Sequence, residues 1–268
     1  MSPAATAARP CRLALLAALP WEVRPFLRQI QARPRRGLGF PAWEFAGGQK
    51  RGLAVLSGMG PEAALAAARR LLEQERPEIL ISLGFGGALT PELLPGALVL
   101  GASFWEYDPQ GALLKPAPAP APPRPLPELL GRLKEAGLPA FAGSLVTTPV
   151  IMPKAKVGEA LSALTHPVLD QETAVLARVA AGEGLAFLGL RAITDGAGEE
   201  IPPFIVQAGG KVGARAALAW LAGDPRRIAA LIRLWRRSRR AADRLAQALA
   251  VWLPLLLGSG QELQDQPA

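Results

Sequence analysis

Cysteine, histidine and tyrosine each occur only once among the 268 residues of this chain. With Cys11 alone, an internal disulfide is excluded. With His166 alone, neither a zinc site of the usual His/Cys kind nor a Ser-His-Asp triad is well supported. Any catalysis by this protein must therefore rest mainly on carboxylates.

Long apolar runs are also missing, since no segment reaches the ~18 uninterrupted apolar residues of a membrane-spanning helix. The N-terminus has the outline of a signal peptide, because arginines precede the apolar run 13–19. That run is short and has no obvious small-residue cleavage site after it. We therefore expect a buried first strand here and a cytoplasmic protein.

Positive charge is concentrated near the C-terminus. The net charge is +8, and residues 211–244 hold ten Lys and Arg against two acids. The rest of the chain is close to neutral. A solvated helix face is the default interpretation of these arginines, and contact with an anionic membrane is the alternative. Nucleic-acid binding is not expected, because few aromatic groups are arranged for stacking on bases.

Apolar strand-like runs alternate with helical patterns along most of the chain. The runs 79–83 and 186–193 are continuously apolar or nearly so, as in strands covered by helices on both faces. Pro61 and Glu62 suit the first turn of a helix. This alternation predicts an α/β fold.

Two segments depart from that alternation. The Pro/Ala-rich stretch at 115–127 predicts an extended surface loop inserted in the domain. From 225 to 252, apolar residues recur three, four or seven apart, which predicts a basic amphipathic helix.

Three acids stand where a strand ends or a helix begins: Glu22 in "LPWEV", Glu172 in "LDQETAV" and Asp195 in "RAITDGAG". Ligands of open α/β sheets bind beyond the strand ends, so these acids could converge on one site. Each also has a purely structural explanation. Glu22 and Glu172 suit the first turn of a helix, where Asp170 could cap, and Asp195 could cap a turn.

The segments "ALPWEV", "SGMG", "ISLGFGGAL", "GALVL", "LDQETA" and "RAITD" follow one another in an order and spacing that resemble the purine nucleoside phosphorylase and nucleosidase superfamily. The form is most similar to the 5′-methylthioadenosine/S-adenosylhomocysteine nucleosidase branch. The segment "GDPRRIAALIRLWRRSRRAADRLAQAL" resembles the C-terminal part of the hopanoid-associated phosphorylase group.

The resemblance implies a nucleoside phosphorylase-type three-layer α/β fold with a mixed central sheet and a helical C-terminal extension. We expect a catalytic domain over residues 1–222 and the extension over 223–268. It further implies a homodimer with no cofactor and no metal. Water and phosphate both remain open as the attacking nucleophile.

The resemblance also implies roles for the three acids. Asp195 would protonate adenine at N7, Glu172 would stabilise the oxocarbenium-like ribosyl group and bind its hydroxyls, and Glu22 would orient the nucleophile. The expected substrate-binding residues are Met59, Gly84, Phe85, Gly86, Gly87, Ile151, Gln171 and Thr194.

Several walls of the expected site depart from the nucleosidase pattern. Phe85 stands where a serine is usual, Ala88 at a glycine and Gln171 at a methionine, and Ile151 or a neighbour replaces an aromatic residue. We therefore expect cleavage of an adenosine with a bulky apolar, adenosylhopane-like 5′-substituent. The alternatives are methylthioadenosine, S-adenosylhomocysteine or futalosine. A membrane-associated nucleoside-binding protein without turnover is the alternative of another class. In either case the basic helix 226–252 could contact the inner membrane peripherally.

Overall fold

A computed structural model describes residues 11–47, 50–110, 113–157, 160–199 and 226–258. The strands are β1 Cys11–Ala17, β2 Arg33–Arg35, β3 Ala42–Gly47, β4 Lys50–Leu56, β5 Ile79–Ala88, β6 Leu98–Asp108, β7 Leu113–Pro116, β8 Ala140–Thr147, β9 Val168–Asp170 and β10 Ala186–Asp195. The helices are α1 Pro20–Gln29, α2 Pro61–Gln74, α3 Leu126–Glu135, the 3-10 turn η1 Lys154–Lys156, α4 Thr173–Glu183 and α7 Arg226–Leu257.

The ten strands form one mixed sheet. β4, β1, β5 and β10 are parallel neighbours, whereas β3 pairs with β4, and β6 with β10, in the antiparallel sense. β10 contacts both β5 and β6, and β9 contacts both β5 and β8, so part of the sheet closes on itself. The carboxyl ends of the four parallel strands meet at one edge, where a ligand site is expected.

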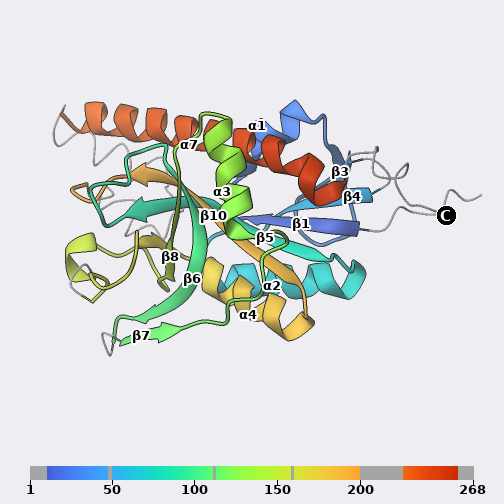
Figure 1. Cartoon of the computed structure of the whole chain (residues 1–268), viewed down its shortest axis with the longest axis horizontal. Coiled ribbons are helices and arrows are strands. Elements are labelled where there is room, and N and C mark those ends of the chain that lie inside the picture. Colours follow the sequence, from blue (N-terminus) through green and yellow to red (C-terminus); the bar gives the residue numbers. More distant parts are fainter. Residues whose placement is uncertain (1–10, 48–49, 111–112, 158–159, 200–225, 259–268) are drawn as a thin grey trace, which may run out of the picture.

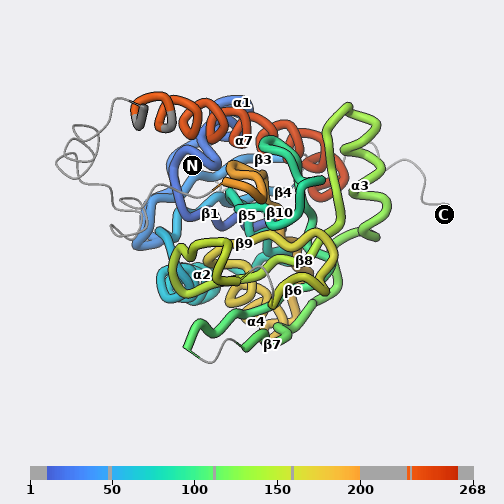
Figure 2. Tube along the Cα trace, turned by 90° about the vertical axis from the view of Figure 1, so that its left-hand side faces the viewer, coloured from blue at the N-terminus to red at the C-terminus, as the bar shows by residue number. Residues whose placement is uncertain are grey.

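Helices cover both faces of the sheet and create two buried cores (Figures 1 and 2). α1, α3 and α7 lie on one face, with Phe26, Leu129 and Trp252 in the core beneath them. α2 and α4 lie on the other face, with Leu71 and Leu176 in the second core. The three-layer α/β fold expected from the sequence is therefore confirmed.

The local sequence signals explain most elements near this edge. β1 begins at Cys11 and is almost wholly buried, so the N-terminal apolar run is a core strand. Every residue of β5 except Phe85 is buried, as its continuous apolar pattern predicts. Pro61 and Glu62 do lie in the first turn of α2.

The Pro/Ala-rich segment is a shorter loop than the predicted 115–127. Lys115 and Pro116 complete β7, which pairs only with β6 among the described strands. Pro116 has no backbone N–H to donate, and an edge strand such as β7 tolerates this because one of its sides has no partner strand in the described part of the chain. At the other end, α3 begins at Leu126 with Pro127 in its first turn, where proline is favoured.

The predicted C-terminal helix is α7, and it packs closely on the sheet layer. Leu245, Leu249 and Trp252 are at most 2% exposed and belong to the same core as β1 and β5. The predicted boundary between 222 and 223 lies outside the described residues. Within the described residues, no helix is long and apolar enough to cross a membrane.

Candidate active site

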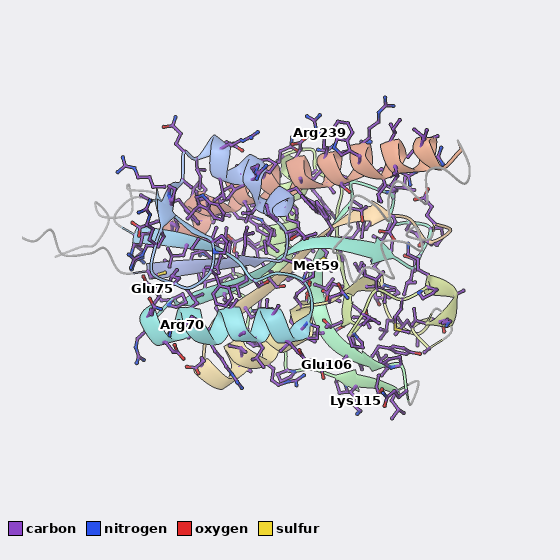
Figure 3. The ribbon with its side chains drawn as sticks, turned by 180° about the vertical axis from the view of Figure 1, so that it is seen from behind. Met59, Arg70, Glu75, Glu106, Lys115 and Arg239 are labelled. Atoms are coloured by element: carbon purple, nitrogen blue, oxygen red, sulfur yellow. The ribbon has the colours of Figure 1, made fainter. Side chains whose placement is uncertain are left out.

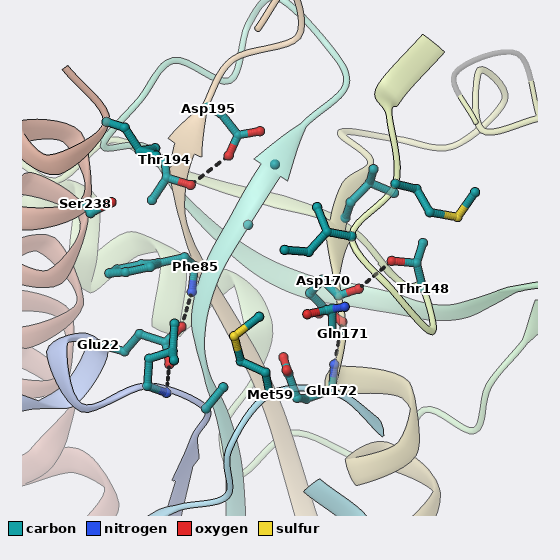
Figure 4. A pocket seen from close by; sticks show the side chains of 18 of the residues that line it. Glu22, Met59, Phe85, Thr148, Asp170, Gln171, Glu172, Thr194, Asp195 and Ser238 are labelled. Atoms are coloured by element: carbon teal, nitrogen blue, oxygen red, sulfur yellow. Dashed lines mark hydrogen bonds between the residues drawn. The ribbon is translucent and has the colours of Figure 1, made fainter. Parts of the chain in front are cut away.

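A pocket of about 500 Å³ opens at the carboxyl ends of the parallel strands. The three acids Glu22, Glu172 and Asp195 all line it. Figure 4 shows Asp195 at one end of the pocket, and Glu22 and Glu172 at the other end on either side of Met59. The volume is in the range of small-molecule sites, about 300–1,000 Å³.

Glu22 is held by backbone N–H groups from two elements. Its carboxylate accepts hydrogen bonds from Leu19 N at 2.7 Å and from Phe85 N at 3.0 Å. The first bond joins the side chain of Glu22 in the first turn of α1 to the backbone N–H of the N-cap residue Leu19, so Glu22 also has the structural role considered from the sequence. Burial raises the pKa of Glu22, and the two N–H donors and Arg191 oppose that rise.

Gly84 makes the approach of β5 to Glu22 feasible. A Cβ atom at this position would lie 2.9 Å from Oε1 of Glu22. Gly84 does not line the pocket itself, in contrast to the other seven expected substrate-binding residues. Those seven are Met59, Phe85, Gly86, Gly87, Ile151, Gln171 and Thr194.

Glu172 stands at the start of α4 and reaches back to the turn after β4. Its Oε1 accepts a hydrogen bond from Gly60 N at 2.9 Å. Burial raises its pKa to about 7; Arg191, 3.9 Å away, opposes the rise, and the carboxylates of Asp170 and Glu22 add to it. Glu172 can therefore exist as a carboxylate or a carboxylic acid near neutral pH.

Asp170 supports this end of the site as a buried structural carboxylate. Its Oδ1 accepts the N–H groups of Glu172 and Thr173, each at 3.1 Å, and the hydroxyl of Thr147 at 2.6 Å. Its Oδ2 lies 3.1 Å from Nε of Arg191. Asp170 thus accepts the N–H groups of Glu172 and Thr173 at the start of α4, but the N-cap position considered for Asp170 is occupied by Glu172.

Arg191 is a site residue that the sequence analysis missed. Its side chain is 1% exposed, and it donates hydrogen bonds to the carbonyl and hydroxyl oxygens of Ser82 at 3.1 and 2.8 Å. The available signal was a lone arginine inside the apolar strand 186–193, because a buried charge requires a partner.

Asp195 ends β10 and is buried in a polar environment. Its Oδ1 accepts a hydrogen bond from the Thr194 hydroxyl at 2.7 Å. Its Oδ2 lies 2.5 Å from Nζ of Lys154, which the sequence analysis also missed. Gly87 leaves space for this contact, since a Cβ there would lie 2.8 Å from Oδ2.

The pocket also has apolar walls that come from distant parts of the chain. Trp21 of α1, and Leu234 with Ser238 of α7, line it, although none of the three was expected. Figure 4 shows the ring of Phe85 pointing toward α7. At one end of the pocket, the carboxylate of Asp195 contacts a hydroxyl and an ammonium group. At the other end, the carboxylates of Glu22 and Glu172 accept hydrogen bonds from backbone N–H groups.

This three-layer α/β fold is the one found in solved nucleosidase structures. The chain belongs to the phosphorylase superfamily, whose family model matches residues 12–222. None of the curated proteins matches the chain in sequence.

Solved structures share the fold at low sequence identity. An S-adenosylhomocysteine nucleosidase from Streptococcus pyogenes, in complex with 5-methylthiotubericidin, is 18% identical with a TM-score of 0.69, covering 93% of this chain and 99% of its own. A Helicobacter pylori 5′-methylthioadenosine/S-adenosylhomocysteine nucleosidase has 15% identity and a TM-score of 0.66, covering 90% and 98%. The futalosine hydrolase of Helicobacter pylori has the same four values.

Proposed function

We propose that this protein cleaves the N-glycosidic bond of a 5′-substituted adenosine and releases adenine. The observation that carries this proposal is the convergence of Glu22, Glu172 and Asp195 on one pocket from three separate parts of the chain. Glycosidic cleavage needs an acid for the leaving group and carboxylates around the ribosyl cation. The separation of Asp195 from the other two acids supports this division of roles.

Asp195 faces the adenine in this proposal, and Glu172 faces the ribose. Protonation at N7 makes adenine a neutral leaving group, because the electron pair of the broken bond stays on the purine ring. The carboxylate of Glu172 stabilises the positive charge that develops on the ribosyl group and accepts hydrogen bonds from its hydroxyls. Glu22, whose position is fixed by Leu19 and Phe85, orients the attacking nucleophile.

Water is the nucleophile that the pocket favours. Among the described lining residues the one cation is Lys154, and it is paired with Asp195. Arg191 lies behind Glu172 and is engaged by Asp170 and Ser82. A phosphate ion needs cationic or N–H donors that are available to it. The proposed reaction uses no cofactor and no metal, which stays a prediction.

The 5′-substituent lies in this proposal against the apolar wall formed by Trp21, Phe85 and Leu234. A bulky apolar group of adenosylhopane type suits such a wall, because burying apolar surface stabilises binding by about 25 cal/mol per Å². Methylthioadenosine, S-adenosylhomocysteine and futalosine are the competing substrates, and the names of the structural neighbours favour them.

A panel of these nucleosides tests the proposal. Each is incubated with the protein, with and without phosphate, and the released purine base and the sugar product are identified by mass spectrometry. We expect adenine and a free ribosyl sugar under both conditions, with the apolar 5′-substituents cleaved fastest. Ribosyl phosphate as the product would overturn the choice of water. Nucleoside binding with no base released would identify a binding protein without turnover.

We further propose that the protein contacts an anionic membrane through α7. Ile228, Ile232 and Trp235 are 44–57% exposed and lie four and three residues apart on the helix, so they form one stripe. Arg239 stacks over the Trp235 ring at 5.0 Å, and Figure 3 shows it on the outer surface of α7. Apolar and cationic side chains together suit an interface of acyl chains and anionic headgroups.

Vesicle sedimentation tests this contact. We expect binding to phosphatidylglycerol vesicles that weakens with salt, and little binding to phosphatidylcholine. Changing Ile232→Ser and Trp235→Ser together should abolish binding. The matched control is Leu113→Ser, which removes a similarly exposed residue from β7, a strand that lies far from α7 (Figure 1). Equal loss in the control would overturn the proposal.

The family resemblance also leads us to propose a homodimer. Analytical ultracentrifugation at micromolar protein concentration tests it, with a single species of twice the 28.2 kDa chain mass as the expected result. A single species of chain mass at that concentration would contradict it.

A further inference from the structure

Lys154 is a buried cation at the Asp195 end of the pocket. Its side chain is 7% exposed and its Nζ lies 2.5 Å from Oδ2 of Asp195. The same nitrogen donates to the backbone oxygens of Asp195 at 3.1 Å and Gly196 at 2.6 Å. A buried ammonium is costly unless it is paired, so these contacts explain why it can stay charged there.

Neighbouring elements leave space for this pair of side chains. Lys154 opens η1, directly after the segment 148–153 that carries Ile151 on the pocket wall. A Cβ at Gly87 would lie 3.2 Å from Cε of Lys154 as well as 2.8 Å from Oδ2 of Asp195. The glycine at the end of β5 therefore admits both members of the pair.

The ion pair creates a difficulty for the acid role of Asp195. The carboxylate of an ion pair carries no proton of its own, yet adenine must receive one as it leaves. Oδ2 of Asp195 is buried and lies 2.5 Å from Nζ of Lys154, so the two atoms are close enough for a proton to pass between them. The pairing that removes the proton from Asp195 therefore also places a proton donor beside it.

We propose that Lys154 is the proton source for release of the purine, acting through Asp195. This inference rests on the proposed function. A lysine ammonium can give up a proton and recover it, and buried lysines serve as acid–base groups for this reason. Lys154 thus acts only through Asp195: it supplies the proton to Asp195, and Asp195 transfers it to the purine.

Protons and electron pairs balance when water is the nucleophile. The ammonium proton passes to Oδ2 of Asp195 and on to N7 of the purine, while the C1′–N9 bond breaks and its electron pair stays on the ring. Water adds to C1′ and loses a proton, and solvent returns one proton to the neutral Lys154 amine. The products are neutral adenine and the ribosyl sugar, and no oxidant or further reactant is consumed.

Two substrates with different leaving groups distinguish proton supply by Lys154 from a structural role of this residue. The first is the adenosine of the panel that the protein cleaves fastest, and the second is the 4-nitrophenyl riboside with the same 5′-substituent. Nitrophenolate leaves without protonation. We expect Lys154→Met to lower kcat for the adenosine by about 10²–10⁴-fold with little change in KM, and to leave cleavage of the nitrophenyl riboside intact.

Lys154→Arg distinguishes proton supply from charge. A guanidinium keeps the positive charge but does not release its proton in proteins. We therefore expect Lys154→Arg to be as slow as Lys154→Met on the adenosine and active on the nitrophenyl riboside. Restoration of the adenosine rate by arginine would overturn the proposal and leave a purely electrostatic role.

Lys156→Met is the matched control, because Lys156 lies on the same turn and is exposed. It should cleave both substrates as the unaltered protein does. Equal losses on both substrates in Lys154→Met would show a structural role and overturn proton supply. If the unaltered protein releases adenine from no nucleoside, the proposed function fails, and the inference fails with it. Normal adenine release by Lys154→Met would overturn the inference alone.

Discussion

The surroundings of the Glu172 carboxyl group shift its pKa in opposite directions. Burial removes water from it and raises its pKa, and the nearby carboxylates of Asp170 and Glu22 act in the same direction. Arg191 and the N–H of Gly60 act in the opposite direction, and the resulting pKa is about 7. A group with this pKa changes its charge in the range where the protein works.

Activity should depend on the charge of Glu172. In the proposed mechanism only the carboxylate form of Glu172 stabilises the ribosyl cation, so we expect kcat/KM to fall about tenfold per pH unit below pH ~7. A pH profile with the best nucleoside of the panel measures this. The low-pH limb should be missing in Glu172→Gln, whose residual rate is low throughout. A flat profile between pH 5 and 8 in the unaltered protein would contradict the assignment.

Glu172 should affect stability in the direction opposite to its effect on activity: the free energy of unfolding should fall as the pH rises. Its folded pKa of about 7 is above the ordinary value of 4.5, so the folded protein binds this proton more tightly than the unfolded chain. The resulting stabilisation is complete below pH 4.5 and is lost as the pH rises through 7. Urea unfolding at pH 5 and 8 should show a smaller loss in Glu172→Gln than in the unaltered protein.

Arg191 should be essential for folding as well as for the site. Removing it leaves the buried carboxylates of Asp170 and Glu172 without their cation. We expect Arg191→Met to lower the free energy of unfolding by about 3–5 kcal/mol. Arg178→Met is the control, because Arg178 is 52% exposed in its pair with Glu106 and should cost about 0–1 kcal/mol. Equal effects in urea unfolding would be inconsistent with this account.

At the scale of the element, α7 presents three different surfaces along one helix. Its C-terminal half is buried on the sheet, with Trp252 donating a hydrogen bond from Nε1 to Leu129 O at 3.2 Å. Its middle, through Leu234 and Ser238, lines the pocket. Its exposed stripe includes Trp235. The buried part is separated from the other two along the helix axis. Leu234 and Trp235 are neighbours in sequence but point in different directions, because successive residues of a helix with 3.6 residues per turn lie on different faces.

The two tryptophans of α7 should respond differently to truncation. Trp252 is fully buried, and we expect Trp252→Ala to lower the free energy of unfolding by about 3–5 kcal/mol. Trp235 is 57% exposed, so Trp235→Ala should change stability by less than about 0.5 kcal/mol. Urea unfolding followed by circular dichroism compares them. A Trp252→Ala protein as stable as the unaltered chain would mean that α7 is not docked as described.

At the scale of the whole molecule, the sheet and its two helical layers are interdependent. The core beneath α1 and α3 contains residues of β1, β5 and β10 together with six or more residues of α7. The pocket likewise takes its walls from α1, β5, β10 and α7. We therefore expect one cooperative unfolding unit.

A chain shortened to residues 1–222 tests this unity. Loss of α7 exposes the apolar face that Leu245, Leu249 and Trp252 now cover. We expect the shortened chain to be unfolded or aggregated, as judged by circular dichroism and gel filtration, and to release no adenine. A folded, non-aggregated and active product would show that 223–268 is a dispensable extension.

Much of the fold could be predicted because its signals are local. Continuous apolar runs define β1, β5 and β10, and Pro61 marks the start of α2. The acids were found because strand ends and helix starts can be recognised within a few residues. Short edge strands such as β2 and β7 were not predicted, because three or four exposed residues carry no periodic pattern.

By itself, the sequence determined the α/β class, the place of the three acids at element ends and the amphipathic character of α7. Only the tertiary structure decided which charges meet. Lys154 contacts a residue 41 positions away and Arg191 one that is 109 positions away. Leu234 reaches the pocket only because α7 docks beside α1. Such partners depend on how layers pack, and packing between distant segments leaves no signal in the local order of residues.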